Sequence, residues 1–368
     1  MFLQRPITAL AMAFAASAAA ADEVSITFLN TGAGANYASF WNEVMERANE
    51  ELPFEIKYVT GEDVIISERL RAQSDEEIDF DVIFIRPEFA LRALEEGFPL
   101  TSLHPSPLVP NAQSIKSELI DTVQGIDTDG KLIPFWRAQY VLFFDTEKVK
   151  NAPTSWKEWV ERKDEYCGKI GFIATDAGSS GGRTVMFDFF RAFGVDWTQP
   201  FEEVQKSEEW KQAAEIFEDF STCFHTPPAS GGPQLFEQMM KGDVWITNYV
   251  IDYTLWSQER GRVPETFAST FLAEGANGLP FYYIVPANIP DDRKEAAAQF
   301  VNFLISDWVQ LKMFTEQYQY PSVESVWDQV PEETWKKAPH PDNIVSTQVE
   351  NAEGYSWIRE NGMQFTAE

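Results

Sequence analysis

Short apolar segments alternate with amphipathic segments along the first part of the chain. Residues 24–30 alternate apolar and polar side chains, and residues 81–85 form a short, wholly apolar run; both are typical of strands. Between them, residues 37–52 repeat apolar side chains at the spacing of one helix face. Strands that alternate with helices form a parallel sheet flanked by helices, so this pattern predicts an α/β fold.

The alternation resumes after a proline-rich stretch at residues 103–110. Before that stretch, a further strand is predicted at 54–59 and further helices at 64–73 and 88–96. After it, strands are predicted at 132–144 (as one strand or two), 169–174, 244–248 and 282–285, and helices at 155–165, 183–193, 208–220, 233–240, 253–260 and 292–305. A chain of 368 residues is long for a single hydrophobic core. We therefore expect two α/β domains.

The N-terminus has the order of a secretory signal peptide. Arg5 supplies a positive charge, residues 7–16 are almost entirely apolar, and small side chains fill residues 17–21. The apolar run is shorter than the roughly 20 residues that a membrane span needs. We expect residues 1–21 to be cleaved and the mature chain to be exported without inserting into the membrane.

The charge of the chain excludes some partners. It contains 58 acidic and 29 basic residues, a formal net charge of −29. Such a chain is repelled by nucleic acids and by anionic membrane surfaces, so neither is expected as a partner. The charge alone does not show that a ligand would be cationic.

The cysteines and histidines give no sign of a metal centre. The chain has two cysteines and three histidines. The histidines are far apart, and no His/Cys spacing resembles a zinc site. In an oxidising compartment Cys167 and Cys223 could form a disulfide, but their spacing does not distinguish a disulfide from two buried thiols. No metal and no cofactor is predicted.

A loop rich in glycine and serine, residues 176–184, is the most informative stretch. It joins a predicted strand to a predicted helix and contains Ser179, Ser180, Gly181, Gly182, Arg183 and Thr184. Glycines allow a ligand to approach the backbone, and amide groups at a helix start, hydroxyls and an arginine can together hold an anion. The alternative is an ordinary turn in which Ser180 caps the helix.

Other candidate binding residues follow predicted strands or lie where two domains would join. Asn30, Thr31 and Gly32 follow the first strand and suit hydrogen bonding, or form an ordinary turn. Arg86 follows the strand at 81–85, where it would reach a ligand or pair with a surface carboxylate. The remaining candidates are Trp136, Arg137 and Tyr140, as aromatic walls or hinge packing, and Asn248, Tyr249, Asp252, Tyr253, Phe281 and Tyr282.

The order of five segments resembles a known family. LIPFWRAQYVLFFDTEKV (132–149) is followed by PTSWKEWVERKDEYCGKIGFIATD (153–176), KGDVWITNY (241–249), EGANGLPFYYIVP (274–286) and EAAAQFVNFLIS (295–306). In this order, and behind a signal peptide, they resemble the periplasmic type II solute-binding proteins of ABC importers. The branch they resemble most includes binders of polyamines, thiamine and ferric iron.

This resemblance implies two α/β domains with the ligand in a cleft between them. It assigns residues 22–137 and 280–305 to a discontinuous first domain, 138–279 to a second, and 306–368 to C-terminal helical segments that pack on both. It also implies a monomer in the periplasm that captures a small polar solute by hinge closure. The partner would be an ABC permease at the inner membrane, or a sensor that docks the loaded protein.

Departures from the relatives narrow the expected ligand. Polyamine binders of this branch tend to carry Trp-x-Asp where this chain has Leu279-Pro280-Phe281, so the carboxylate that would meet an ammonium is missing. Ferric-iron binders tend to use tandem tyrosines after a short strand, where this chain has Asn248-Tyr249-Val250. The pair Tyr282-Tyr283 exists, but on a strand its side chains point to opposite faces.

A small organic solute with an anionic group, such as a phosphate ester, phosphonate or carboxylate, therefore remains the favoured ligand, because arginine forks bind such groups. An amine held by Asp252 and aromatic faces is the alternative, with ferric iron less favoured. An enzyme with a cysteine nucleophile is a remote alternative, because neither cysteine is predicted at a strand's carboxyl end. No catalytic residue is predicted.

Overall fold

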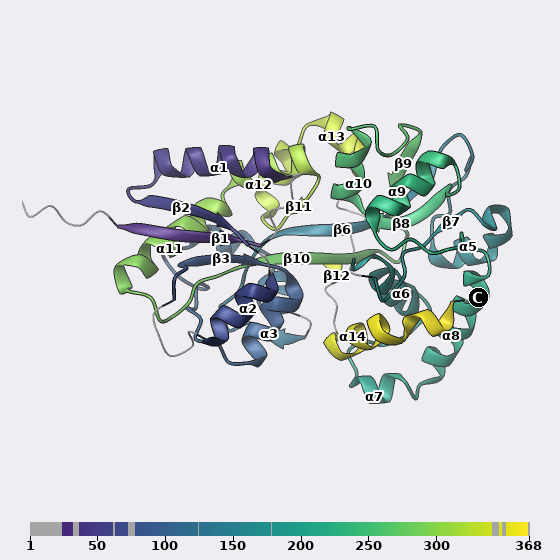
Figure 1. Cartoon of the computed structure of the whole chain (residues 1–368), viewed down its shortest axis with the longest axis horizontal. Coiled ribbons are helices and arrows are strands. Elements are labelled where there is room, and N and C mark those ends of the chain that lie inside the picture. Colours follow the sequence, from purple (N-terminus) through teal and green to yellow (C-terminus); the bar gives the residue numbers. More distant parts are fainter. Residues whose placement is uncertain are drawn as a thin grey trace, which may run out of the picture.

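The computed structural model describes residues 24–31, 37–61, 63–72, 78–123, 125–177, 179–340, 346–347 and 351–366. The predicted signal peptide lies outside these residues. Figure 1 shows two lobes side by side, joined by two long strands. In the described part of the chain, no helix is long and apolar enough to cross a membrane.

The first lobe is built on parallel strands. Strand β1 (Ser25–Asn30) pairs in parallel with β2 (Glu55–Thr60) on one side and with β3 (Val82–Ile85) on the other, as the alternating sequence pattern predicted. The helices of this lobe are α1 (Ala38–Glu51), α2 (Asp63–Ala72), α3 (Pro87–Glu95) and α11 (Asp291–Leu304), and a short excursion adds α4 (Ser117–Ile120), β4 (Thr122–Val123) and β5 (Ile126–Asp127).

Two long antiparallel strands connect the lobes. Strand β6 (Ile133–Asp145) is continuous, and β10 (Ala276–Ile284) begins six residues earlier than the sequence pattern predicted. Their register places Gly278 opposite Gln139 and Pro280 opposite Arg137. The main sheet has the order β2-β1-β3-β10-β6-β8-β7, so one sheet runs through both lobes.

The second lobe surrounds the other half of β6. Strands β8 (Ile246–Val250) and β9 (Phe267–Thr270) pair antiparallel with β6, and β7 (Ile170–Gly171) pairs in parallel with β8. The predicted strand at 169–174 is shorter than expected, because only Ile173 continues the pairing, through an isolated bridge to Ala229. The helices are α5 (Trp156–Glu161), α6 (Gly181–Ala192), α7 (Phe201–Val204), α8 (Glu208–Ser221), α9 (Gly232–Lys241) and α10 (Ile251–Gln258).

The C-terminal segments pack on both lobes. They are α12 (Asp307–Gln317), β11 (Tyr320–Pro321), α13 (Glu332–Lys337), β12 (Ser346–Thr347) and α14 (Ala352–Asn361). Helix α12 joins the lobes directly, because Met313 packs in the core of the first lobe and Phe314 in the core of the second. Helix α14 lies along α6, beside the gap that separates it from α3 in Figure 1.

The hydrophobic cores follow the two faces of the sheet in the first lobe. Tyr283 packs with Phe28 and Trp41 on one face, whereas Tyr282 packs among aliphatic side chains on the other. The prediction that these adjacent tyrosines point to opposite faces is confirmed. Both phenols are fully buried, so this pair offers no joint binding site.

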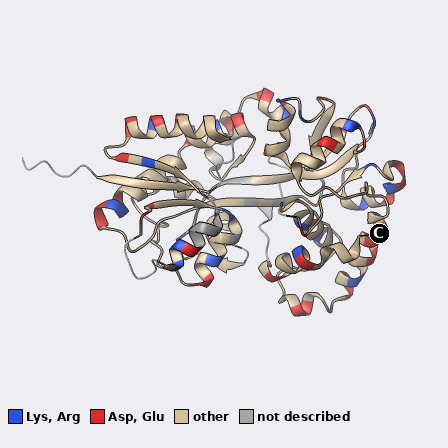
Figure 2. Ribbon diagram, viewed as in Figure 1, with Lys and Arg blue, Asp and Glu red and all other residues tan. Residues whose placement is uncertain are grey.

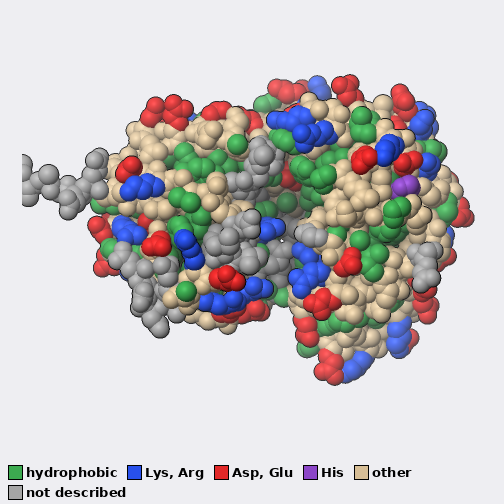
Figure 3. All heavy atoms as spheres, viewed as in Figure 1, with side chains coloured by type: hydrophobic (Ala, Val, Ile, Leu, Met, Phe, Trp, Pro, Cys, Tyr) green, Lys and Arg blue, Asp and Glu red, His purple; other side chains and the backbone are tan. Residues whose placement is uncertain are grey.

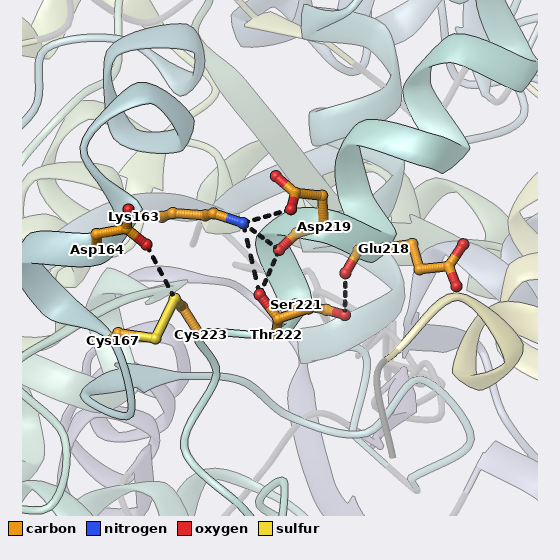
Figure 4. The surroundings of a disulfide bond; sticks show 8 residues. All are labelled: Lys163, Asp164, Cys167, Glu218, Asp219, Ser221, Thr222 and Cys223. Carbon is orange, nitrogen blue, oxygen red and sulfur yellow. Dashed lines mark hydrogen bonds and ion pairs between the residues drawn. A yellow bond between two sulfur atoms is a disulfide. The ribbon is translucent and has the colours of Figure 1, made fainter.

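A disulfide closes the far side of the second lobe. Cys167, just before β7, is bonded to Cys223, just after α8, which resolves the alternative that the sequence left open. Figure 4 shows the bond beside Asp164 and close to Lys163, which donates a hydrogen bond to the carbonyl oxygen of Asp219. The bond therefore ties the segment after α5 to the end of α8.

Removing this disulfide should destabilise the second lobe. The cysteines are 56 residues apart, and a loop of that size corresponds to about 4 kcal/mol of lost unfolded-state entropy. The Cys167→Ala/Cys223→Ala variant should show a loss of this size in urea-induced unfolding. Reductant should lower the unfolding midpoint of the native protein and leave that of the variant unchanged; equal responses would contradict the prediction.

Candidate functional site

A cavity of about 220 Å³ lies where the two lobes meet. Figure 3 shows the molecule hollowed between the lobes, with basic side chains near the hollow, while the ribbon in Figure 2 shows acidic residues spread over the outer helices of both lobes. The lining residues come from both lobes, from the connecting strands and from the segment after α12: Tyr37, Arg86, Pro87, Ala138, Ser179, Ser180, Arg183, Val250, Asp252, Phe281 and Gln319.

The ends of several strands bring the polar residues together. Arg86 follows β3 and directly precedes α3, which begins with Pro87 at a position where the missing proline N–H costs nothing. Asp252 follows β8 in the first turn of α10. Ser180 directly precedes α6. Ligands of α/β sheets bind beyond the carboxyl ends of strands, and this cavity has that position.

A hydrogen-bonded chain crosses the cavity between the lobes. The hydroxyl of Tyr37, at the start of α1, donates to Oδ2 of Asp252 at 2.8 Å, and Nε2 of Gln319 donates to the same hydroxyl at 2.9 Å. Asp252 is only 5% exposed, and its Oδ1 atom has no hydrogen-bond partner among the described residues. A buried carboxylate oxygen without a partner is unusual, because its desolvation is not compensated.

The burial of Asp252 changes its protonation. Loss of solvent raises the pKa of its carboxyl from 3.8 to about 6, although hydrogen bonds from Tyr37, from backbone amides and from Gln319 oppose this change. The group therefore titrates close to neutral pH, well above an ordinary aspartate.

The serines of the Gly/Ser loop take part in hydrogen bonds beside the cavity. The hydroxyls of Tyr140 and Ser180 lie 3.1 Å apart, and Oγ of Ser179 accepts the amide N–H of Gly181 at 3.3 Å. Ser180 makes no side-chain capping bond to α6. Its hydroxyl faces Tyr140 and the cavity lining instead.

The side chains of the described residues offer no assembled metal site at this cavity. One group of potential ligands lies within the described residues, Asp164 with Cys167 and Cys223, on the far side of the second lobe. Its two sulfur atoms are bonded to each other, and a disulfide does not present the thiolates that bind metal ions.

Comparison with known families decides the kind of protein. The family model of the bacterial extracellular solute-binding proteins matches residues 43–342, which is most of the chain. The chain belongs to this family. None of the curated proteins compared with this solute-binding protein matches it in sequence.

Solved structures share its fold at low sequence identity. The spermidine/putrescine ABC transporter substrate-binding protein from Streptococcus pneumoniae has a TM-score of 0.70 and 14% identity, covering 93% of this chain and 98% of that one. The cyclic α-maltosyl-1,6-maltose binding protein from Arthrobacter globiformis has a TM-score of 0.74 and 14% identity, and the match covers 93% of this chain and 94% of that one. The Bordetella ferric binding protein has a TM-score of 0.67 and 12% identity, and the match covers 93% of this chain and 98% of that one. The predicted type II periplasmic binding fold is confirmed.

The predicted site residues of this solute-binding protein separate into two groups. The cavity brings together Arg86, Ser179, Ser180, Arg183, Asp252 and Phe281, whereas the other candidates that the structure describes do not line it. Asn30 is buried and donates to the Tyr58 hydroxyl, and Thr31 donates to the Phe84 carbonyl. Gly32 and the side chains of Trp136 and Arg137 lie outside the described part of the structure.

The remaining candidates support the cavity walls. Tyr140 and Tyr249 pack edge to face behind the lining, and Tyr253 stacks near Phe236 and Trp256. Asn248 is buried in β8, Thr184 bonds to the Tyr355 hydroxyl, and Tyr282 is buried in the first lobe.

Two polar lining residues, Tyr37 and Gln319, were missed from the sequence, as were the apolar Pro87, Ala138 and Val250. Tyr37 opens a predicted helix just after a glycine-containing loop, and that position was a usable signal. Gln319 follows α12 in a segment with no local pattern of its own, so only the folded chain places it opposite Asp252.

Gly182 has a packing role that differs from the predicted ligand contact. A Cβ atom at this position would lie 1.8 Å from the carbonyl oxygen of Ile173, and a Cβ atom at Gly181 would lie 2.7 Å from the Ile173 side chain and 3.0 Å from that of Tyr249. Both glycines are buried and do not line the cavity. They let α6 start directly against the segment after β7, which places Arg183 at the cavity.

Gly182→Ala should therefore destabilise the protein, by about 1–3 kcal/mol, because α6 must shift away from Ile173. Gly231→Ala is the matched control, since the nearest atom to its new Cβ would lie 3.9 Å away. Urea-induced unfolding of both variants measures the difference. Equal stabilities would show that α6 is not tightly packed here.

The raised pKa of Asp252 has a measurable effect on stability. Folding favours the protonated carboxyl, so its contribution is fully present below about pH 4 and is lost as the pH rises through about 6. The free energy of unfolding of Asp252→Asn minus that of the native protein should increase by about 2 kcal/mol from pH 4 to pH 7.

The second variant of this test is Tyr37→Phe, which removes a hydrogen bond that lowers the pKa of Asp252. When both proteins also carry Tyr37→Phe, the pH-dependent rise in the difference between their free energies of unfolding should extend to higher pH. A difference that is constant between pH 4 and pH 8 would contradict both expectations.

Proposed function

We propose that this protein is the solute-binding component of an ABC importer, which captures a small polar solute in the periplasm as a monomer and delivers it to a permease. Membership of the solute-binding family supports this role. The observation that carries it is a cavity lined by residues of both lobes, several of them charged or polar. Such a cavity can be formed and opened by movement of one lobe against the other.

In this proposal the lobes are the two domains expected from the sequence, residues 22–137 with 280–305 and residues 138–279, and residues 306–368 pack on both. The hinge consists of the paired segments of β6 and β10 together with α12. Closure brings Tyr37 of the first domain to Asp252 of the second, a contact that an open form would break.

Within this role, the cavity suits a solute with an anionic group. Arg86 and Arg183 reach it from opposite domains, and the hydroxyls of Ser179 and Ser180 lie on the same lining. Guanidinium groups bind phosphates and carboxylates through paired hydrogen bonds. The N-terminus of α6 adds a favourable dipole beside the serines.

Asp252 supports a second candidate, a cationic amine, because its carboxylate also lines the cavity. Ferric iron is less favoured, since the described residues of the lining include one carboxylate and one tyrosine. The enzyme alternative needs a free thiol, and the disulfide holds both cysteines away from this cavity.

A thermal-shift screen of the mature protein tests the role. The panel contains sugar phosphates, phosphonates, carboxylates, amino acids, aminoalkyl phosphates, polyamines, thiamine and ferric iron. A bound solute at a hundredfold excess over its Kd should stabilise the protein by about 2.7 kcal/mol, which raises the melting temperature by several degrees.

Arg183→Gln should abolish the shift caused by an anionic solute, while Arg262→Gln should preserve it. Arg262 is the matched control because it is exposed and packs over Trp256 on α10, away from the cavity lining. The absence of any shift across the whole panel would count against the proposed role. A shift with an amine that survives Arg183→Gln would favour the second candidate.

A further inference from the structure

The cavity contains groups of opposite charge at fixed places. Asp252 is held on one side by the Tyr37 hydroxyl, which Gln319 in turn fixes from the segment after α12. Arg86 and Arg183 belong to the same lining, as do Ser179 and Ser180. A ligand in this space therefore meets hydrogen-bond donors and a carboxylate acceptor at the same time.

The Asp252 carboxylate is the decisive feature. Its Oδ2 atom already accepts from Tyr37, whereas Oδ1 is buried without a hydrogen-bond partner among the described residues. Leaving a charged acceptor unsatisfied costs more than leaving a neutral one, and a donor supplied by a ligand removes that cost. A purely anionic solute would instead be repelled by this carboxylate.

We propose, building on the solute-binding role above, that the solute is a small zwitterion whose ammonium group donates to Asp252 while its anionic group is held by Arg86 and Arg183. Each charged end of such a molecule meets a group of opposite sign in the same cavity. Neither end alone satisfies both sides of the lining.

The size of the cavity limits this class further. Its volume of about 220 Å³ lies below the roughly 300–1,000 Å³ of drug-sized sites. Amino acids and aminoalkyl phosphates are compatible with a space of this size. Phe281, which stacks on Phe84 with ring centroids 5.4 Å apart, supplies an apolar wall against which a short methylene chain can lie.

The chemistry also sets the expected selectivity. A site built around paired polar groups discriminates strongly against an analogue that lacks one of them, because the partner group is then buried without a hydrogen bond. Removing the ammonium or the anionic group from the solute should therefore weaken binding at least about tenfold, since either loss exceeds about 1.4 kcal/mol.

Isothermal titration calorimetry with matched triplets tests this inference. One triplet is 4-aminobutanoate, butanoate and butylamine; another is O-phosphoethanolamine, ethyl phosphate and ethanolamine; α-amino acids with their deamino and decarboxylated analogues extend the series. For at least one triplet, the zwitterion should bind at least tenfold more tightly than either of its two analogues.

Two variants assign the ends of the molecule. Asp252→Asn should reduce the affinity of the zwitterion to about that of its anionic analogue, and Arg183→Gln should reduce it to about that of the amine. Glu237→Gln on α9 is the matched acid-to-amide control, because Glu237 is exposed and pairs only with Lys241 among the described residues. It should leave affinity unchanged.

The failures of the two proposals can be told apart. If an anion or an amine binds as tightly as every matched zwitterion, or if Asp252→Asn leaves zwitterion affinity unchanged, the zwitterion assignment is wrong and the solute-binding role stands. If no zwitterion binds but another compound of the thermal-shift panel does, the zwitterion assignment is again wrong and the solute-binding role again stands. If no compound binds in either experiment, both proposals fail.

Discussion

The antiparallel pairing of β6 with β10 is the constraint on which the rest of the structure depends. These two strands carry the sheet from one lobe to the other, and their register places Gly278 opposite Gln139 at the junction. Ala138 and Phe281, which line the cavity, lie on them. Because each lobe is built outwards from this pair, residues that follow strands of both lobes, such as Arg86 and Asp252, meet at the cavity.

The site is made at some expense of stability. Burying the Asp252 carboxyl raises its pKa to about 6. At neutral pH the folded state therefore contains a buried carboxylate that would be more stable in water. Tyr37 and Gln319 compensate part of this and at the same time fix the direction of the carboxylate. A preorganised acceptor of this kind binds a donor without first having to be ordered, which is how such a penalty is recovered on binding.

Much of the fold was predictable because local patterns agree with it. The strand and helix periodicities located most elements to within a few residues, and the opposite directions of Tyr282 and Tyr283 follow from strand geometry alone. The site was less predictable. Arg86, Arg183 and Asp252 were found because they follow strands, but Gly182, chosen for ligand approach, is needed for the packing of α6 on Ile173. Glycine permits both roles, and only the neighbouring atoms distinguish them.

The sequence by itself determined the α/β class, the alternation of elements, the family resemblance and the residue types available at the ends of strands. Those properties depend on local periodicity and on the order of segments along the chain. The tertiary structure decided that Cys167 and Cys223 are bonded, that Gln319 lies beside Tyr37, and that two arginines share a cavity with a buried aspartate. These are contacts between residues far apart in sequence. Their distances depend on how both lobes pack around β6 and β10, and a local sequence pattern contains no information about that packing.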